Sequence, residues 1–276
     1  MNEKFNFSRF WTYFKYDIVQ LWRHNGKAVL VIGGLGLILY VVHVLGSLIF
    51  PDHIWTAPQL VTRLVFFYLG MFALLLYQTR TYGYLTEKQA GSSWLMIPAS
   101  KAEKFTSMSL ITLIIQPLAF VLVYLGIDAL LCLVDPSAGT SIVASSSELG
   151  TNLADVSAEL QEVGLSVNRL ILPFVLSVFS SLAYFLLCGI CFKKWKIVGA
   201  FAVLFAVQTV LLFLVGGLAQ TGWFQDLANG LDISMESPDT AKWFINKILL
   251  YSNIVSLIIW GGLMAGIFYR IKTLKH

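Results

Sequence analysis

Three ionisable side chains interrupt long apolar runs of the sequence: His43, Arg63 and Asp128. Charged groups in apolar surroundings are costly, so they usually pair with each other or line a polar path. A buried pair between Arg63 and Asp128 is one prediction. In the other, the long Arg63 side chain reaches a polar surface, and Asp128 marks the end of its apolar run. Both stay open here, and His43 completes a candidate polar cluster.

The cysteines and the common catalytic motifs offer less chemistry. Cys188 and Cys191 have the spacing of a metal-binding pair, but no further ligands lie near in the sequence. We therefore expect them and Cys132 to be small buried thiols. The sequence contains no GxxxxGKS/T phosphate loop, no HExxH metal motif and no GxSxG nucleophile elbow. We predict no catalytic, cofactor-binding or metal-binding residues, and no nucleic-acid-binding module.

Long apolar helices must hold these side chains. Of the 276 residues, 57% are hydrophobic and only 12% are charged, whereas a soluble domain carries about 25% charged residues. The apolar residues gather in runs of about 20, enough for a helix to cross roughly 30 Å of hydrocarbon. The sequence thus predicts an all-α membrane protein with a single transmembrane domain over residues 1–276. Its six expected spans are roughly 28–50, 60–80, 107–134, 169–192, 197–218 and 247–269.

The distribution of positive charge predicts the orientation. Fifteen of the 19 lysines and arginines lie in the N-terminal segment, the connector after the second span, the Lys193–Lys196 turn and the C-terminal tail. Lysine and arginine near the ends of spans resist translocation and stay on the cytoplasmic side. We therefore expect a multi-pass protein of the cytoplasmic (inner) membrane, with both termini in the cytoplasm.

The N-terminal segment, residues 1–26, predicts an interfacial helix that lies flat on the membrane. Asn6 or Ser8 is expected to cap its start. The alternative is a soluble amphipathic helix packed on a neighbour. An apolar stripe at helical spacing is opposed by a polar face. The stripe is Phe7, Phe10, Trp11, Phe14, Ile18, Leu21 and Trp22, and the polar face is Arg9, Lys15, Asp17, Gln20 and Arg23.

The connector between the second and third spans has the most unusual local sequence, GSSWLMIPASKAEKFTS, from Gly91 to Ser107. Its apolar stretch Trp94–Pro98 is too short to cross a membrane and too apolar to lie in water. Such a segment rests on the membrane surface or inserts into a groove of a partner protein. Pro98 suits a turn or the first position of a helix, which Ser100 is expected to cap.

This order of features resembles the membrane subunits of ATP-binding-cassette exporters of the type-2 permease superfamily. Those subunits combine an N-terminal interfacial helix, six transmembrane helices, a cytoplasmic coupling helix after the second span and outer re-entrant helices. At the level of motif the resemblance covers a dozen residues, WLMIPASKAEKF, which are similar to a stretch of bacterial members. It implies that this stretch docks into a groove of the ATPase subunit. The residues that match by position are Trp94, Leu95, Ile97, Pro98, Ser100, Lys101, Glu103, Lys104 and Phe105.

Two outer segments complete the comparison with that plan. The connector over 135–168 is longer than the plan requires. Its serine-rich start predicts a mobile loop, and residues 153–165 predict a short amphipathic helix. The segment Ala219–Asn246 matches the outer re-entrant region in place. There we expect two short helices, with Trp243 and Phe244 in the outer aromatic belt.

The resemblance implies a permease subunit of an exporter, driven by two copies of a separate ATPase. Six spans are half of the family's twelve, so a second permease subunit, identical or different, is the implied partner, with lipid around both. The chain itself is not expected to be an enzyme or to bind nucleic acid. Two other classes stay open: a membrane enzyme that no motif reveals, and a sensor or assembly protein that transports nothing. The uniformly apolar spans favour amphipathic cargo over small ions.

Overall fold

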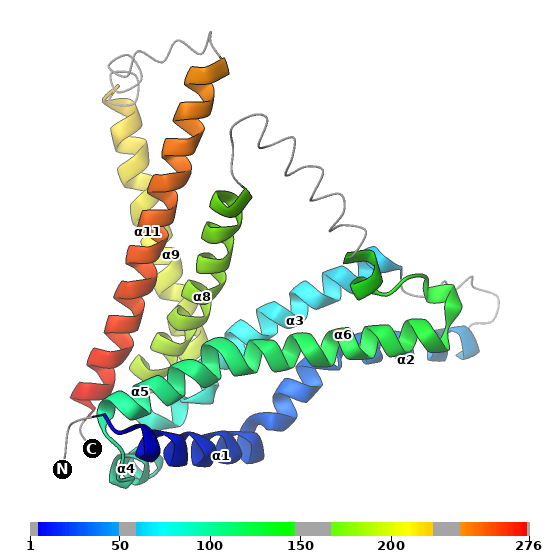
Figure 1. Ribbon diagram of the computed structural model, residues 1–276, viewed down its shortest axis with the longest axis horizontal. Coiled ribbons are helices and arrows are strands. Elements are labelled where there is room, and N and C mark those ends of the chain that lie inside the picture. The colour runs from blue at the N-terminus through cyan, green and yellow to red at the C-terminus, as the bar shows by residue number, and fades with distance from the viewer. Residues whose placement is uncertain (1–4, 50–58, 147–166, 223–237, 275–276) are drawn as a thin grey trace.

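The computed structural model describes residues 5–49, 59–146, 167–222 and 238–274, and every regular element within them is a helix (Figure 1). The elements are α1 (Phe7–Gly33), α2 (Leu35–Ile49), α3 (Leu60–Thr81), η1 (Gly83–Thr86), α4 (Lys88–Met96), α5 (Lys101–Leu110), η2 (Ile111–Ile115), α6 (Gln116–Val134), η3 (Pro136–Ala138), α8 (Val167–Cys191), α9 (Lys196–Gln220) and α11 (Pro238–Thr273).

Five of the described helical stretches are long and apolar enough to cross a membrane. They are Leu60–Thr86, Lys101–Val134, Ile171–Cys191, Lys196–Leu214 and Asn246–Thr273. A sixth crossing results if the bent pair formed by the end of α1 and by α2 counts as one span. By helix length and hydropathy the chain is therefore a multi-pass membrane protein, as its composition predicted.

The first span differs from the expected single helix over 28–50. α1 runs without a break from Phe7 to Gly33, and the chain then bends by 50° before α2 begins. A Cβ on Gly33 would lie only 2.7 Å from Val123, so α6 passes very close at this point. Adjacent glycines such as Gly33 and Gly34 are a common cause of helix kinks. The bend therefore falls at the glycine pair, beyond residue 26, where the interfacial helix was expected to end.

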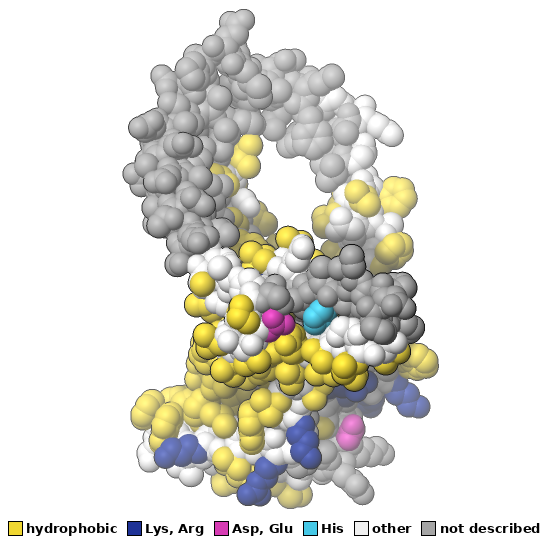
Figure 2. Space-filling view, turned by 90° about the vertical axis from the view of Figure 1, so that its right-hand side faces the viewer, with side chains coloured by type: hydrophobic (Ala, Val, Ile, Leu, Met, Phe, Trp, Pro, Cys, Tyr) yellow, Lys and Arg dark blue, Asp and Glu magenta, His cyan; other side chains and the backbone are white. Residues whose placement is uncertain are grey.

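Two groups of helices share one end of the molecule, which we call the basic end. Figure 1 shows α2, α3 and α6 extending from it in one direction and α8, α9 and α11 in another, with α1, α4 and α5 at the shared end. In Figure 2 the visible lysine and arginine side chains gather at this end, below a broad hydrophobic band. Charge and helix packing thus single out the same end.

The main hydrophobic core lies at the basic end and joins both groups of helices. Its buried side chains include Tyr82 between α3 and η1, Trp94 of α4 and Ile267 of α11. A smaller core, built on Leu74 and Phe120, lies between α3 and α6. The spanning parts of α9 and α11 bury only 6% and 0% of their residues. Their apolar surfaces therefore need lipid or another chain to cover them.

α3 and α8 approach each other very closely at Gly189, between the two cysteines of the CxxC pattern. A Cβ on Gly189 would lie 2.5 Å from the carbonyl oxygen of Thr79, so only glycine fits against this backbone. Cys188 beside it is buried, as predicted. Cys191 is exposed and Cys132 is only partly buried, so the prediction of three buried thiols is wrong for these two.

The third span contains a π-helical turn, η2, that the apolar pattern did not predict. In this turn the Gln116 N–H donates to the carbonyl of Ile111, five residues back. The next donor in that register would be Pro117, which has no N–H to offer to the Thr112 carbonyl. The buried Gln78 of α3 supplies the donor instead, with its Nε2 3.1 Å from the Thr112 oxygen. Because Pro117 leaves the Thr112 carbonyl without a helical donor, a buried amide side chain is needed at Gln78.

Other expected boundaries also differ. The third spanning helix begins at Lys101 rather than at 107, because Ser100 caps it there. α11 is continuous from Pro238, so residues 238–246 do not form a separate short helix. The remaining part of that expected re-entrant pair, 223–237, and the helix expected over 153–165 lie outside the described residues.

Candidate functional site

The connector between α3 and the third span folds into an elbow, residues 88–110. α4 ends at Met96, and α5 begins at Lys101 after a short turn. Ser100 caps α5 as predicted, since its Oγ accepts from the Glu103 N–H at 3.2 Å. The Glu103 carboxylate accepts in return from the Ser100 N–H at 2.8 Å. This capping box fixes the point at which α5 leaves the turn.

One face of α1 holds the elbow in place. Polar side chains recur along it at four-residue spacing, at Arg9, Tyr13 and Asp17. Residues four apart lie on one side of a helix, so the three side chains point the same way. Each meets a polar group of the elbow, and we call these three contacts the joint.

Glu103 makes the first contact of the joint. Its carboxylate accepts from Arg9 Nε at 2.8 Å and from Arg9 Nη2 at 2.7 Å, and also from the Asn6 N–H at 2.8 Å. The Glu103 side chain is fully buried, whereas that of Arg9 is 34% exposed. With the Ser100 N–H, four donors meet this buried carboxylate, which satisfies its charge. Asn6 is also the N-cap of α1, one of the two caps predicted.

Trp94 makes the second contact. Its indole Nε1 donates to the Tyr13 hydroxyl at 3.0 Å, and the residue is almost completely buried. Lys104 Nζ lies 4.6 Å from the centre of the indole ring and donates to the carbonyls of Trp94 and Leu95 at 2.8 and 3.3 Å. These carbonyls are at the end of α4, where helical partners run out. Lys104 therefore ties the end of α4 to α5.

Asp17 makes the third contact. Its carboxylate accepts from the Tyr82 hydroxyl at 2.9 Å and the Ser107 hydroxyl at 2.6 Å, and only 2% of the residue is exposed. Within the described parts of the chain no cation pairs with it. Burial raises the pKa of the Asp17 carboxyl, and hydrogen bonds from Ser107, Tyr82 and Tyr13 oppose that rise only in part. Asp17 is therefore a buried acid held by neutral donors.

These contacts change the predicted division of α1 into two faces. Asp17, expected on the polar outer face, is buried because the face that carries it turns towards the elbow. Phe10 and Leu21 of the predicted apolar stripe are also buried. Members of that stripe that stay exposed are Phe7, Trp11 and Trp22. α1 thus packs on its neighbours with one side and leaves aromatic side chains exposed on the other, and the interfacial helix stays a prediction.

The elbow exposes only part of the set predicted to contact a partner. Four members, Trp94, Ser100, Glu103 and Lys104, are buried. Phe105 packs edge-on against Phe268 of α11, with ring centres 5.4 Å apart. Two members, Pro98 and Lys101, are exposed, and Met96 between the members of the set is 81% exposed. Three others are partly exposed and pack against the main core: Leu95, Ile97 and Phe105. The surface of the elbow is therefore an apolar tip, which we define as Leu95–Pro98.

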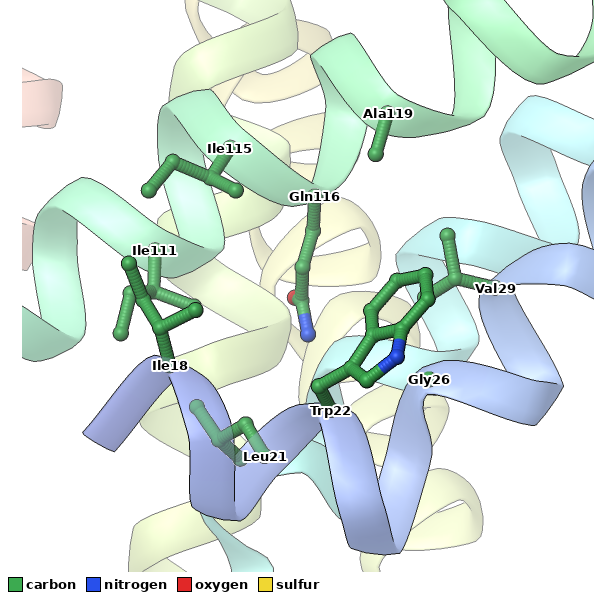
Figure 3. A pocket seen from close by; sticks show the side chains of 9 residues that line it. All are labelled: Ile18, Leu21, Trp22, Gly26, Val29, Ile111, Ile115, Gln116 and Ala119. Atoms are coloured by element: carbon green, nitrogen blue, oxygen red, sulfur yellow. The ribbon is translucent and has the colours of Figure 1, made fainter. Parts of the chain in front are cut away.

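A small cavity lies next to the joint, between α1 and the η2–α6 part of the third span. Its volume is about 60 Å³, and Figure 3 shows Gln116 extending into it towards Trp22 of α1. Gln116 Nε2 lies 3.5 Å from the Thr81 hydroxyl, and Gln116 Oε1 has no hydrogen-bond partner among the described residues. α1 is therefore bonded firmly at its N-terminal half and packed more loosely around Trp22.

Arg63 and Asp128 form the predicted pair, at the end of α3 and α6 away from the basic end. Arg63 Nη1 lies 2.7 Å from Asp128 Oδ1, and both side chains are buried. Arg63 Nη2 donates to the carbonyls of Ala138 and Thr140 at 2.9 and 2.8 Å. Asp128 Oδ2 accepts from the Ile142 N–H at 2.7 Å. We call this pair the clip; the alternative in which Arg63 extends to a polar surface is wrong.

His43, the third predicted member of that cluster, forms no ion pair with Asp128 among the described residues. Its ring centre is 6.1 Å from that of Tyr40, whose hydroxyl donates to Asp135 at 3.2 Å. His43 Nδ1 has no hydrogen-bond partner in the described part of the chain. The described residues also contain no group of three or more His, Cys, Asp or Glu side chains that could hold a metal ion. The predicted three-residue cluster is therefore a pair.

The chain matches none of the protein-family models, curated proteins or solved structures with which it was compared. Fold and site together define a helical membrane protein with five to six candidate spans. In it, a buried polar joint holds an exposed apolar tip.

Proposed function

We propose that this chain is the membrane-spanning permease subunit of an ATP-binding-cassette exporter, driven by a separate ATPase subunit that binds the elbow. The motif resemblance of residues 94–105 supports the proposal. The observation that carries it is the exposure of Met96 and Pro98, with Leu95 and Ile97 partly exposed beside them, on an elbow that is otherwise bonded into the joint. An exposed apolar anchor on a rigid support is what a partner's groove recognises.

A force applied at the tip has two routes into the membrane. α5 continues through η2 into α6, so movement of the elbow passes directly to the third span. The joint passes the same movement to α1 through its contacts at Glu103, Trp94 and Asp17. α1 leads on to the bend at Gly33, so the first and third spans would move together. Rocking of a bundle of spans in this way is a known basis of alternating access.

The distribution of charge and of exposed apolar surface indicates which partners the proposed permease needs. The elbow lies at the basic end, and the excess of lysine and arginine in its connectors favours the cytoplasmic side. A soluble, ATP-hydrolysing partner would reach the tip from there. The uncovered apolar surfaces of α9 and α11 suit lipid and a second permease subunit.

Co-expression with candidate ATP-binding-cassette ATPase subunits tests the docking. The variant Met96→Asp/Ile97→Asp places two carboxylates on the tip and should lose the ATPase during purification in detergent. Trp195→Asp is the matched control, because Trp195 is 78% exposed in the α8–α9 turn but lies outside the elbow. It should keep the ATPase. An undiminished complex with the double variant would contradict the docking role.

A second variant distinguishes binding of the ATPase at the tip from transmission of its movement through the joint. Trp94→Phe keeps an aromatic ring in the core and leaves the tip unchanged, but it removes the hydrogen bond to Tyr13. We expect it to bind the ATPase normally and to reduce the effect of the permease on ATP hydrolysis. Labelling that places an introduced Met96→Cys thiol on the external face would refute the proposal as a whole.

A further inference from the structure

A groove of about 470 Å³ lies where α5 and η2 meet α8 and α11. Its volume falls in the range of small-molecule sites, about 300–1,000 Å³. None of its lining side chains is charged. The residues that carry the argument are Phe105, Ser109, Leu113, Phe179, Trp260 and Met264.

The groove exists because α5 and α11 meet at the basic end and then separate. At that end Lys101 Nζ donates to the Lys272 carbonyl at 3.0 Å, and Phe105 packs against Phe268. Figure 1 shows the two helices diverging from this point. Four-residue spacing continues both contact faces into the groove, from Phe105 to Ser109 and from Phe268 through Met264 to Trp260.

Two polar atoms of this apolar groove lack partners. Ser109 Oγ and Trp260 Nε1 are both shielded from solvent, and neither has a hydrogen-bond partner among the described residues. Ser109 is more than nine-tenths buried. An indole N–H can only donate, so an occupant that satisfies Trp260 must present an acceptor. Buried polar groups are rarely left unpaired without a reason.

Bulk phospholipid does not meet this requirement. At 1.5 Å per residue, Ser109 lies about 12 Å along α5 from Lys101, and Trp260 about 20 Å along α11 from Thr273. Both positions fall inside helical stretches that are long and apolar enough to cross a membrane, where acyl chains rather than the ester oxygens of phospholipids surround a spanning helix. Acyl chains at this depth offer no acceptor.

We propose that this groove binds a neutral, mostly apolar molecule that carries a carbonyl oxygen, which accepts hydrogen bonds from Trp260 and Ser109. The lining residues supply the apolar contact, and the absence of charge among them excludes an ionic ligand. The site stands whether or not the chain is a permease.

The probe 4-hexylbenzophenone tests the site, because its ketone is both the hydrogen-bond acceptor and the photoreactive group. In lipid nanodiscs, irradiation should label peptides containing Ser109 and Trp260 saturably. The double variant Ser109→Ala/Trp260→Phe should weaken that labelling about tenfold, as expected for the loss of two hydrogen bonds. Ser109→Phe should abolish it by filling the groove. Thr209→Ala, which removes a hydroxyl bonded within α9, should leave it unchanged.

A competition experiment needs only the wild-type protein, so it does not depend on folding of the variants. 4-Hexyldiphenylmethane has the same shape without the oxygen and should compete about tenfold less well than unirradiated 4-hexylbenzophenone. Equal competition by the two compounds would overturn the proposal. Labelling that does not saturate, or that persists in Ser109→Phe, would do so too, because it would show the random contact made by any lipid-soluble compound.

Discussion

The clip and the joint are both buried polar clusters, but they differ in whether every acidic side chain has a counter-ion. In the clip, Arg63 and Asp128 neutralise each other, and backbone groups on the following connector bond to Arg63 Nη2 and Asp128 Oδ2, while Arg63 Nε has no partner among the described residues. In the joint, Glu103 is paired with Arg9, whereas Asp17 is buried among neutral hydroxyl groups. Only the joint lies beside an exposed apolar tip.

Because of this difference, we expect the clip to hold its helices more rigidly than the joint holds α1 and the elbow. Separating a buried ion pair would leave two uncompensated charges, so the clip holds α3 and α6 at one distance. The joint holds an acid without a counter-ion next to a cavity at Trp22, and it can change at lower cost. Under the proposed function, the far end of α3 and α6 would be the anchor, and the basic end would be the part that transmits movement.

The strongest test of this comparison leaves one charge of the clip unpaired. Arg63→Leu buries the Asp128 carboxylate without its cation, which should cost about 3–5 kcal/mol of stability. Thermal loss of helical circular dichroism in detergent measures it. Arg63→Leu/Asp128→Leu removes both charges and should recover most of that loss. Equal stability of the single and double variants would show that the two side chains do not act as a pair.

The next largest effect is expected at the basic end, where α3 and α8 touch. Gly189→Ala places a methyl group against the Thr79 backbone, which cannot move aside as a side chain can. We expect a loss of about 1–3 kcal/mol, typical of overpacking, in the same thermal measurement. Gly262→Ala is the matched control, because no atom lies within 4 Å of a Cβ there. A stable Gly189→Ala protein would mean that the two helices are not held this close.

A smaller effect is expected from the ion pair of the joint. Arg9→Met should lower the stability only slightly, because Arg9 is a third exposed and solvent screens its charge. Glu103 keeps its donors from Asn6 and Ser100 in this variant. In a double-mutant cycle with Glu103→Gln, most of that cost should appear as coupling energy. Additive effects would show that Arg9 and Glu103 are neighbours without an energetic link.

Strong local signals made much of this architecture predictable from the sequence. Apolar runs of spanning length located the crossings, and the expected cap at Ser100 located the start of α5. The bend at Gly33 and the π turn before Pro117 were missed, because a hydropathy pattern records where a helix is apolar but not how its axis runs.

The joint was missed for a different reason. Arg9, Tyr13 and Asp17 are spaced four apart, which is a visible signal, but the aromatic stripe on the same helix was the stronger pattern. Trp94 was read as a surface anchor because the sequence does not reveal that Tyr13 and Lys104 enclose it. Contacts between segments some 80 residues apart have no local signature, whereas the Arg63–Asp128 pair was open to prediction because intramembrane charges seek partners.

The last and smallest effect is a dependence of stability on pH. The folded protein raises the pKa of Asp17 above its ordinary value of 3.8, chiefly through burial. Its contribution to stability is therefore fully present below that ordinary value and is lost as the pH rises through the raised value.

Asp17→Asn keeps an oxygen that accepts from Tyr82 and Ser107 but cannot ionise. Its stability should stay within about 1 kcal/mol of the wild type at neutral pH. Thermal unfolding at pH 4 to 8 should show the wild type losing stability relative to Asp17→Asn as the pH increases. The opposite trend would mean that the joint stabilises Asp17 as a carboxylate, and the basic end would then be as firmly fixed as the clip.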